Sequence, residues 1–117
     1  MQFEVFTLLP EVFPPYLESS ILQRARQRGL INVHVHNIRD YTYDRHHTTD
    51  DTPYGGGGGM VMKPEPVFAA IEHLLGTTNS GEYPKGTSVV LLSPQGTPLK
   101  QALARELADD IDAFRMK

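Results

Sequence analysis

The chain has 117 residues, no cysteine and a formal net charge of −3, with 39% hydrophobic and 21% charged residues. This composition indicates one globular domain with a single core, and it excludes a disulfide framework and cysteine-based zinc sites. It also argues against a basic nucleic-acid surface over the whole chain. No apolar run approaches the length of a bilayer span, and residues 1–4 lack the basic start of a signal peptide. We therefore expect a cytoplasmic protein without a membrane segment.

The first part of the chain predicts a β-α-β arrangement. Residues 2–9 alternate apolar and polar side chains and then become apolar, as in a strand, and Pro10 ends that pattern. Apolar residues at helical spacing over 17–25 predict a helix, with Gly29 at its C-terminal cap. Residues 31–36 alternate again and predict a second strand.

The rest of the chain continues the alternation after a long irregular stretch. Residues 40–63 have no regular period, and a loop of that length is either functional or disordered. We expect a helix over 64–75, a buried apolar strand over 88–92 and a helix from Leu99 towards Phe114. Strands that alternate with helices predict an α/β fold, with a parallel sheet and helices on both of its faces.

Five consecutive glycines, Gly55 to Gly59, form the most unusual stretch of the sequence. Glycines gather in this way where the backbone must bend or approach another molecule closely. A flexible linker is the alternative, but Tyr54 and Met60 bracket the run where linkers carry polar residues. The run fits neither the P-loop nor the dinucleotide fingerprint. What remains is a loop that presents bare backbone N–H and C=O groups to a flat or polar ligand.

A second candidate loop, Ser93 to Gly96, follows the predicted strand 88–92 directly. Ligands of open α/β sheets bind beyond the carboxyl ends of the strands, so this loop could offer backbone polar groups to an adenine or a ribose. An ordinary turn between a strand and a helix is the alternative.

Histidines and loop carboxylates suggest a rival chemistry. His34 and His36 share one face of the predicted second strand, and His46, His47 and Asp50 could complete the metal site of a hydrolase. The polar face of a strand beside a solvated loop is the simpler interpretation.

Other charged residues receive no specific role from the pattern. Loop aspartates usually form turns or cap helices, so we assign no catalytic residue among them: Asp40, Asp44, Asp50 and Asp51. Three arginines within one helical stretch fit a solvated helix face or a phosphate contact: Arg24, Arg26 and Arg28.

Four segments, in order and spacing, resemble the bacterial tRNA (guanine-N1)-methyltransferase family from the N-terminus to about Leu107. They are Phe6-Thr7-Leu8-Leu9-Pro10-Glu11-Val12-Phe13, Asn37-Ile38-Arg39-Asp40-Tyr41, the stretch from Asp50-Asp51-Thr52-Pro53-Tyr54 through the glycines to Met62, and Leu91-Leu92-Ser93-Pro94-Gln95-Gly96. Four motifs that agree together are far more specific than any one of them.

The resemblance implies the trefoil-knotted SPOUT methyltransferase fold, S-adenosylmethionine as methyl donor, and methylation of guanine N1 next to the anticodon of tRNA. It also implies a homodimer with active sites between the subunits. Two sets of site residues follow from it. The cofactor-binding set, on the adenosine side, is Leu91, Leu92, Ser93, Pro94, Gln95 and Gly96. The substrate-binding set, near the target base, is Asp50, Tyr54, Gly55, Gly56, Gly57 and Gly59.

The end of the chain departs from the family pattern. Residues 110–117 do not begin the second glycine-rich cofactor segment, of the Gly-Arg-Tyr-Glu-Gly kind, that the resemblance implies. We therefore expect residues 1–117 to be a truncated N-terminal part of the SPOUT domain, inactive alone, without the knot-forming half, the general base or the C-terminal tRNA-binding domain. One alternative is a non-enzymatic module that dimerises through exposed apolar surface. A metal-dependent hydrolase is the other.

Overall fold

The computed structural model describes residues 1–76, 83–84 and 86–115. The chain divides into two compact units, residues 1–76 and residues 77–117. Within the described residues, no helix combines the length and the apolar character that a membrane crossing needs.

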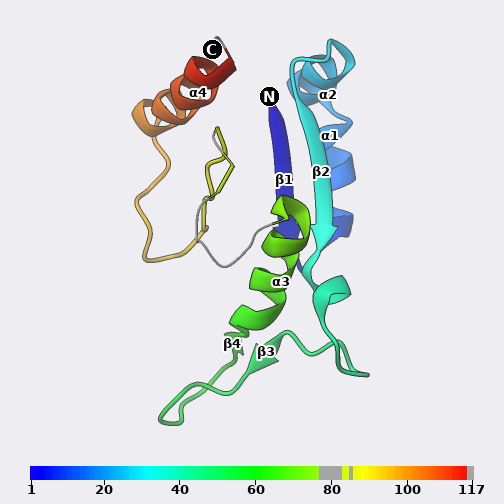
Figure 1. The fold of residues 1–117 in the computed structure, drawn as a ribbon, viewed down its shortest axis with the longest axis vertical. Coiled ribbons are helices and arrows are strands. Elements are labelled where there is room, and N and C mark those ends of the chain that lie inside the picture. Colours follow the sequence, from blue (N-terminus) through cyan, green and yellow to red (C-terminus); the bar gives the residue numbers. More distant parts are fainter. Residues whose placement is uncertain (77–82, 85, 116–117) are drawn as a thin grey trace. The chain divides into compact units, whose positions relative to one another are not determined.

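Of the helices and strands in the described residues, all but one long helix lie in the first unit (Figure 1). Its elements are β1 (Gln2–Thr7), η1 (Pro10–Val12), α1 (Phe13–Leu17), α2 (Ser20–Gln27), β2 (Asn32–Asn37), η2 (Ile38–Tyr41), β3 (Asp50–Asp51), β4 (Val61–Met62) and α3 (Pro64–Leu75).

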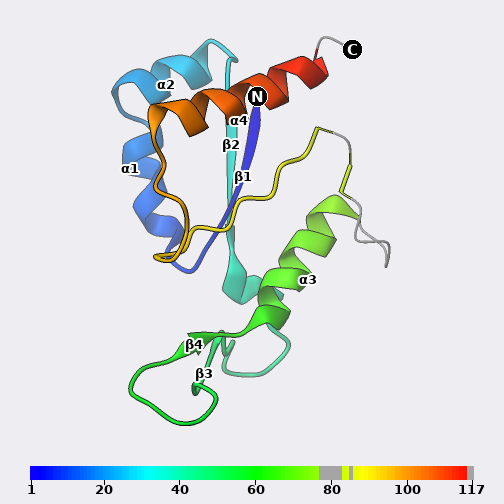
Figure 2. The ribbon, with the colours of Figure 1, turned by 90° about the vertical axis from the view of Figure 1, so that its left-hand side faces the viewer.

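Strands β1 and β2 form a parallel pair that runs in register from Gln2 opposite Asn32 to Thr7 opposite Asn37. In Figures 1 and 2, α1 and α2 lie on one side of this pair and α3 lies towards the other. The predicted β-α-β arrangement, with helices on both faces of a parallel pair, is therefore present in this unit.

The predicted first helix is interrupted and forms as α1 and α2. Ser19, between them, is extended, and Ser20 has a φ of 50°. The predicted cap is confirmed, because Gly29 has a φ of 68° and the Leu30 N–H donates to the Ala25 carbonyl at 3.0 Å. This left-handed turn directs the chain from α2 into β2.

The best-buried apolar side chains of the first unit lie where η2 meets α3. Ile38, Pro66 and Ala70 are buried, and the rings of Tyr41 and His73 lie 5.6 Å apart. This small core holds η2 against α3 just beyond the carboxyl end of β2. The long loop that the sequence predicted after β2 is therefore anchored at its start.

The second unit contains α4 (Gln101–Arg115). The predicted strand over 88–92 is wrong for this structure, because these residues have no regular secondary structure. Leu91 and Leu92 are 82% and 90% exposed. A strand exists only where a neighbouring strand satisfies its backbone groups, and no partner strand pairs with this segment among the described residues.

Candidate functional site

The glycine run forms the loop of a short hairpin beyond the β1–β2 pair. Asp50 pairs with Met62 and Asp51 with Val61 in the antiparallel β3–β4 ladder. In both ribbon views the connecting loop extends away from the β1–β2 pair (Figures 1 and 2). Residues 50–62, which we call the glycine hairpin, thus project from the edge of the fold where ligands of α/β sheets bind.

The glycines shape this loop through their backbone angles. Gly55, Gly56 and Gly59 have φ values of 84°, 75° and 96°, and Gly57 has a φ of 154°. Residues with a Cβ rarely adopt such angles, which explains why glycine is used here. No atom lies within 4 Å of a Cβ built at any of the five glycines. The loop therefore leaves its backbone groups open to another molecule.

A small pocket of about 150 Å³ lies between the glycine hairpin and the start of α3. Asp51, Tyr54, Met62, Lys63 and Glu65 contribute to its lining. An aromatic ring and a thioether suit a flat apolar surface, while carboxylates and an ammonium group suit the polar edge of a ring. The lining therefore combines apolar and charged groups that suit a flat ring with a polar edge.

One of the predicted substrate residues lines this pocket and the others do not. Tyr54 is fully exposed and reaches the pocket. Asp50 is half-buried at the base of the hairpin and is not part of the lining. Gly55, Gly56, Gly57 and Gly59 are not part of the lining either, so Tyr54 alone of the predicted substrate residues reaches this pocket.

The second predicted loop, Ser93 to Gly96, is a tight turn in the second unit. The Gly96 N–H donates to the Ser93 carbonyl at 3.0 Å, and the Gln95 N–H donates to the Ser93 hydroxyl at 3.2 Å. A Cβ on Gly96 would lie 3.1 Å from the Ser93 carbonyl oxygen, so glycine allows this turn to close tightly. This turn and the glycine hairpin belong to different compact units.

The histidines of β2 bind a carboxylate of the neighbouring strand. His34 Nδ1 lies 3.0 Å from Glu4 Oε1, and His36 Nε2 lies 2.5 Å from Glu4 Oε2. Phe6 stacks on His36 with the ring centroids 5.0 Å apart. Sequence reasoning missed Glu4, because alternation shows which residues of one strand share a face, whereas the register that sets Glu4 opposite His34 comes from the pairing of the strands.

The metal-site hypothesis finds no support in this arrangement. Across the described residues, no group of three or more His, Asp or Glu side chains could hold a metal ion. His47 contacts Thr42 and the Arg39 carbonyl instead of the β2 histidines. The side chains that the sequence grouped by type are therefore separated by the fold.

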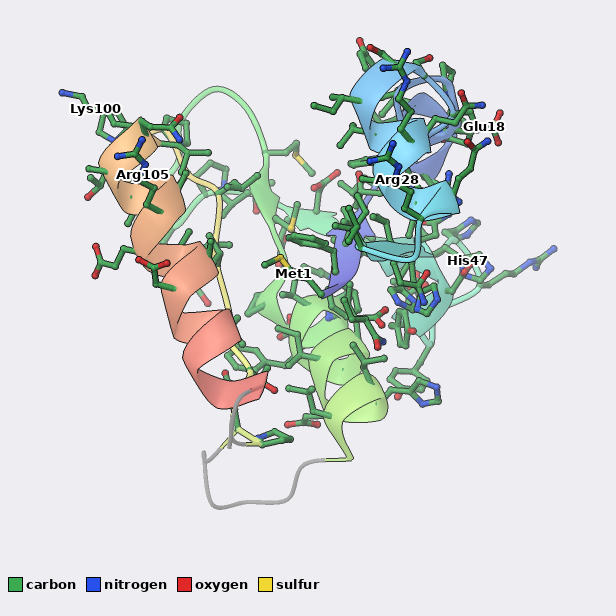
Figure 3. The ribbon with its side chains drawn as sticks, turned by 90° about the horizontal axis from the view of Figure 1, so that it is seen from above. Met1, Glu18, Arg28, His47, Lys100 and Arg105 are labelled. Carbon is green, nitrogen blue, oxygen red and sulfur yellow. The ribbon has the colours of Figure 1, made fainter. Side chains whose placement is uncertain are left out.

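The arginines of α2 are exposed, in agreement with a solvated helix face. The Arg26 side chain donates to the Leu17 carbonyl at 3.1 Å, which ties the end of α1 to α2. Figure 3 shows Arg28 at the end of α2 and His47 on the loop that follows η2. Arg26 therefore has a structural contact, and nothing in the structure assigns these arginines a ligand.

Comparison with known proteins gives a consistent result. Residues 1–113 match the family described as tRNA (Guanine-1)-methyltransferase TrmD. A tRNA (guanine-N(1)-)-methyltransferase of Brevibacillus brevis is 50% identical over 110 residues, which cover 94% of this chain and 42% of the relative. The corresponding protein of Desulforudis audaxviator is 52% identical over 108 residues, which cover 92% of this chain and 41% of the relative.

A solved structure supports the fold. The crystal structure of tRNA (m1G37) methyltransferase from Aquifex aeolicus matches with a TM-score of 0.76 and 33% sequence identity, over 92% of this chain and 46% of that chain. The match confirms the predicted fold class, that of part of a SPOUT methyltransferase domain. The chain spans about two-fifths of the length of the curated relatives that it matches. With residues 1–113 matched, the chain belongs to the tRNA (guanine-1)-methyltransferase TrmD family.

Proposed function

We propose that the protein to which these residues belong transfers a methyl group from S-adenosylmethionine to N1 of a guanine next to the anticodon of tRNA. The observation that carries this proposal is the family match over residues 1–113. The names of the relatives, tRNA (guanine-N(1)-)-methyltransferase, agree with it. Within this proposal, one segment of the first unit is assigned to the base and one segment of the second unit to the cofactor.

The glycine hairpin is the part proposed for the target base. A base that is methylated on its Watson–Crick edge leaves its stack and enters a flat pocket. Glycines without neighbouring side chains let the backbone approach such a ring closely. In this proposal Tyr54 stacks on or beside the base, and the open backbone of Gly55, Gly56, Gly57 and Gly59, outside the small pocket, forms a wall against which the ring lies. Asp50 supports the wall from the base of the hairpin.

The turn at residues 91–96 is the part proposed for the cofactor. The exposed side chains of Leu91 and Leu92 offer apolar surface to an adenine ring. The tight turn from Ser93 through Pro94 and Gln95 to Gly96 presents backbone polar groups to the ribose. These residues fit the adenosine half of S-adenosylmethionine, which supplies the electrophilic methyl group when bound. The described residues contain no group that we assign as the catalytic base.

Further elements of the proposal concern the whole protein. We propose that it acts as a cytoplasmic homodimer, and that residues 1–117 are an N-terminal part of its methyltransferase domain. The coverage of the relatives, about two-fifths of their length, supports this partial-domain interpretation. The exposed run Val89 to Leu92 supports association, because large exposed apolar patches often mark contact surfaces.

The test is a methylation assay on the full-length protein. Purified protein is incubated with S-adenosylmethionine carrying a labelled methyl group and with a tRNA transcript that has guanine next to the anticodon. A matched transcript with adenine at that position is the control. We expect 1-methylguanosine in the nuclease digest of the first transcript, identified by mass spectrometry, and no label in the second. A label on any other nucleoside, or none at all, contradicts the proposal.

The 117-residue chain provides a second measurement. With one part of the cofactor site in the described residues, we expect very weak or no heat of S-adenosylhomocysteine binding in calorimetry. Tight binding to this chain would show that residues 1–117 hold a complete cofactor site, and it would contradict the partial-domain proposal while leaving the methyl transfer itself open to the assay above.

A further inference from the structure

The loop between η2 and the glycine hairpin is held by its own side chains. The Arg39 guanidinium donates to the His47 carbonyl at 3.3 Å, and the Thr42 hydroxyl donates to the Arg39 carbonyl at 2.6 Å. His47 Nδ1 lies 2.9 Å from Thr42 Oγ1, and His47 has a φ of 50°, which is uncommon for a residue with a side chain. Residues 39–47 thus form a closed, internally bonded turn next to the core at η2.

Asp44 binds Thr48, which lies two residues before β3. Its two carboxylate oxygens accept the Thr48 N–H at 3.0 and 3.2 Å, and Oδ2 also accepts the Thr48 hydroxyl at 2.6 Å. Hydrogen bonds to a charged acceptor are about twice as strong as those between neutral groups. The hydrogen bonds of Thr48, its hydroxyl bond above all, hold the pKa of Asp44 below the usual 3.8, so the carboxylate stays ionised at neutral pH. Asp44 therefore fixes the position of Thr48.

Thr48 is followed directly by the residue that is hydrogen-bonded at the base of the glycine hairpin. The next residue, Thr49, is buried, and its carbonyl accepts the Lys63 N–H at 2.7 Å. This bond lies immediately beside the first pair of the β3–β4 ladder, Asp50 with Met62. A ladder of two residue pairs is too short to be stable alone. The segment from Asp44 to Thr49 consequently supplies much of the support for the hairpin.

We propose that Asp44 is a positioning residue that holds the glycine hairpin, through Thr48, in the form that receives the target guanine. The inference rests on the proposed function for its link to tRNA, whereas the support of the hairpin stands on the contacts alone. Asp44 differs in this respect from Asp40, which is exposed on η2 and accepts no hydrogen bond recorded among the described residues. The sequence gives no reason to prefer one of these two aspartates, whereas the structure shows hydrogen bonds to Asp44.

The first experiment measures the hairpin in the 117-residue chain. Asp44→Ala removes all three bonds to Thr48, Asp44→Asn keeps one oxygen that can accept the N–H, and Asp40→Ala is the matched control. Amide hydrogen exchange of Lys63 reports the bond to Thr49 directly. We expect exchange to be about tenfold faster in Asp44→Ala, faster by a smaller factor in Asp44→Asn, and unchanged in Asp40→Ala. Equal exchange in Asp44→Ala and the wild type overturns the inference.

The second experiment measures the link to function in the full-length protein. Asp44→Ala is expected to raise KM for tRNA about tenfold, with the Kd for S-adenosylhomocysteine unchanged, and Asp44→Asn is expected to recover part of the loss. A general loss of folding would weaken cofactor binding as well, so this difference separates positioning from destabilisation. Faster exchange with an unchanged KM overturns the positioning role. A wild-type protein that does not methylate tRNA contradicts the proposed function, and the exchange measurement then still decides whether Asp44 supports the hairpin.

Discussion

At the scale of single residues, the carboxylate of Glu4 joins the two parallel strands of the first unit. It lies in β1 opposite His34 and contacts both His34 and His36 of β2. Burial opposes its ionisation, but hydrogen bonds from His36, Gln2 and His34 outweigh this cost and hold the pKa of Glu4 below the usual 4.5. The carboxylate therefore links two strands that are 30 residues apart in sequence.

This lowered pKa predicts an acid-dependent loss of stability. A carboxyl group whose pKa is lower in the folded state stabilises the fold above its unfolded pKa, and this contribution disappears as the pH falls through the folded pKa. We expect urea unfolding to show that the free-energy difference between the wild type and Glu4→Gln is largest above the usual pKa of 4.5 and shrinks below it.

Glu11→Gln is the control for the removal of one carboxylate, because Glu11 lies in η1 and its side chain makes no hydrogen bond within the described residues. A pH dependence that is the same in Glu4→Gln and in Glu11→Gln would not come from the contacts of Glu4. A difference between Glu4→Gln and the wild type that does not change with pH would show that the contacts to His34 and His36 do not stabilise the ionised form.

At the scale of elements, the glycine hairpin combines a short ladder with a loop whose conformation depends on glycine. Gly58 is the exception among the five, since no positive φ is recorded for it. Gly58 and Gly59 are alike in having no atom within 4 Å of a Cβ. Alanine at Gly58 and at Gly59 therefore differs in backbone strain but not in steric contact, and comparing the two substitutions measures the strain alone.

We predict that Gly59→Ala costs about 1 to 2 kcal/mol of loop stability and that Gly58→Ala costs little, because a Cβ is strained only at the positive φ. Exchange of the backbone amides in residues 50–62, followed by NMR, measures the difference without any ligand. Similar effects of the two substitutions would mean that the loop does not hold the backbone angles described above.

The sequence predicted the elements whose side chains carry a period and missed those without one. Helix α3 is found as expected, from Pro64 to Leu75, and Gly76 has the left-handed angles of a cap. The two-residue strands β3 and β4 are too short to show alternation, so the hairpin was predicted only as an irregular loop. The segment 88–92 has the composition of a buried strand, but pairing depends on a partner that a local pattern cannot supply.

In the candidate site, the sequence predicted the backbone conformation of the glycine run but not the side-chain contacts that support it. Glycine at positions 55–59 indicated unusual backbone angles, and four of these residues have a positive φ. The bonds of Asp44 to Thr48 were not predicted individually, although the general rule that loop aspartates form turns is confirmed there. Side-chain partners depend on the path of the backbone between them, which local sequence leaves open.

At the scale of the whole molecule, exposed apolar side chains occur in both units, and the second unit carries a run of four in consecutive positions. Val89, Val90, Leu91 and Leu92 are consecutive and all are exposed. Single exposed apolar side chains are normal in soluble proteins, whereas a continuous run favours association. The 117-residue chain should therefore form dimers or larger species as its concentration rises.

We predict that Leu91→Ser combined with Leu92→Ser weakens this association, which sedimentation velocity over a range of concentrations can measure. Leu30→Ser is the control, because Leu30 is also exposed but lies outside the run. A strict monomer at every concentration would contradict the prediction for the wild type. Equal association of the double variant and the wild type would instead place the contact elsewhere.

The positive φ angles of the glycine hairpin also bear on handedness. A left-handed backbone is unfavourable for an L-amino acid, but it is the favoured region of its mirror image. D-alanine placed by chemical synthesis at Gly55, with a φ of 84°, should therefore keep the loop and restrict the unfolded chain more than glycine does. In this hairpin, glycine serves as the genetically encoded substitute for a D-residue. A D-amino acid at such a position would add a side chain to the loop without straining the backbone around it.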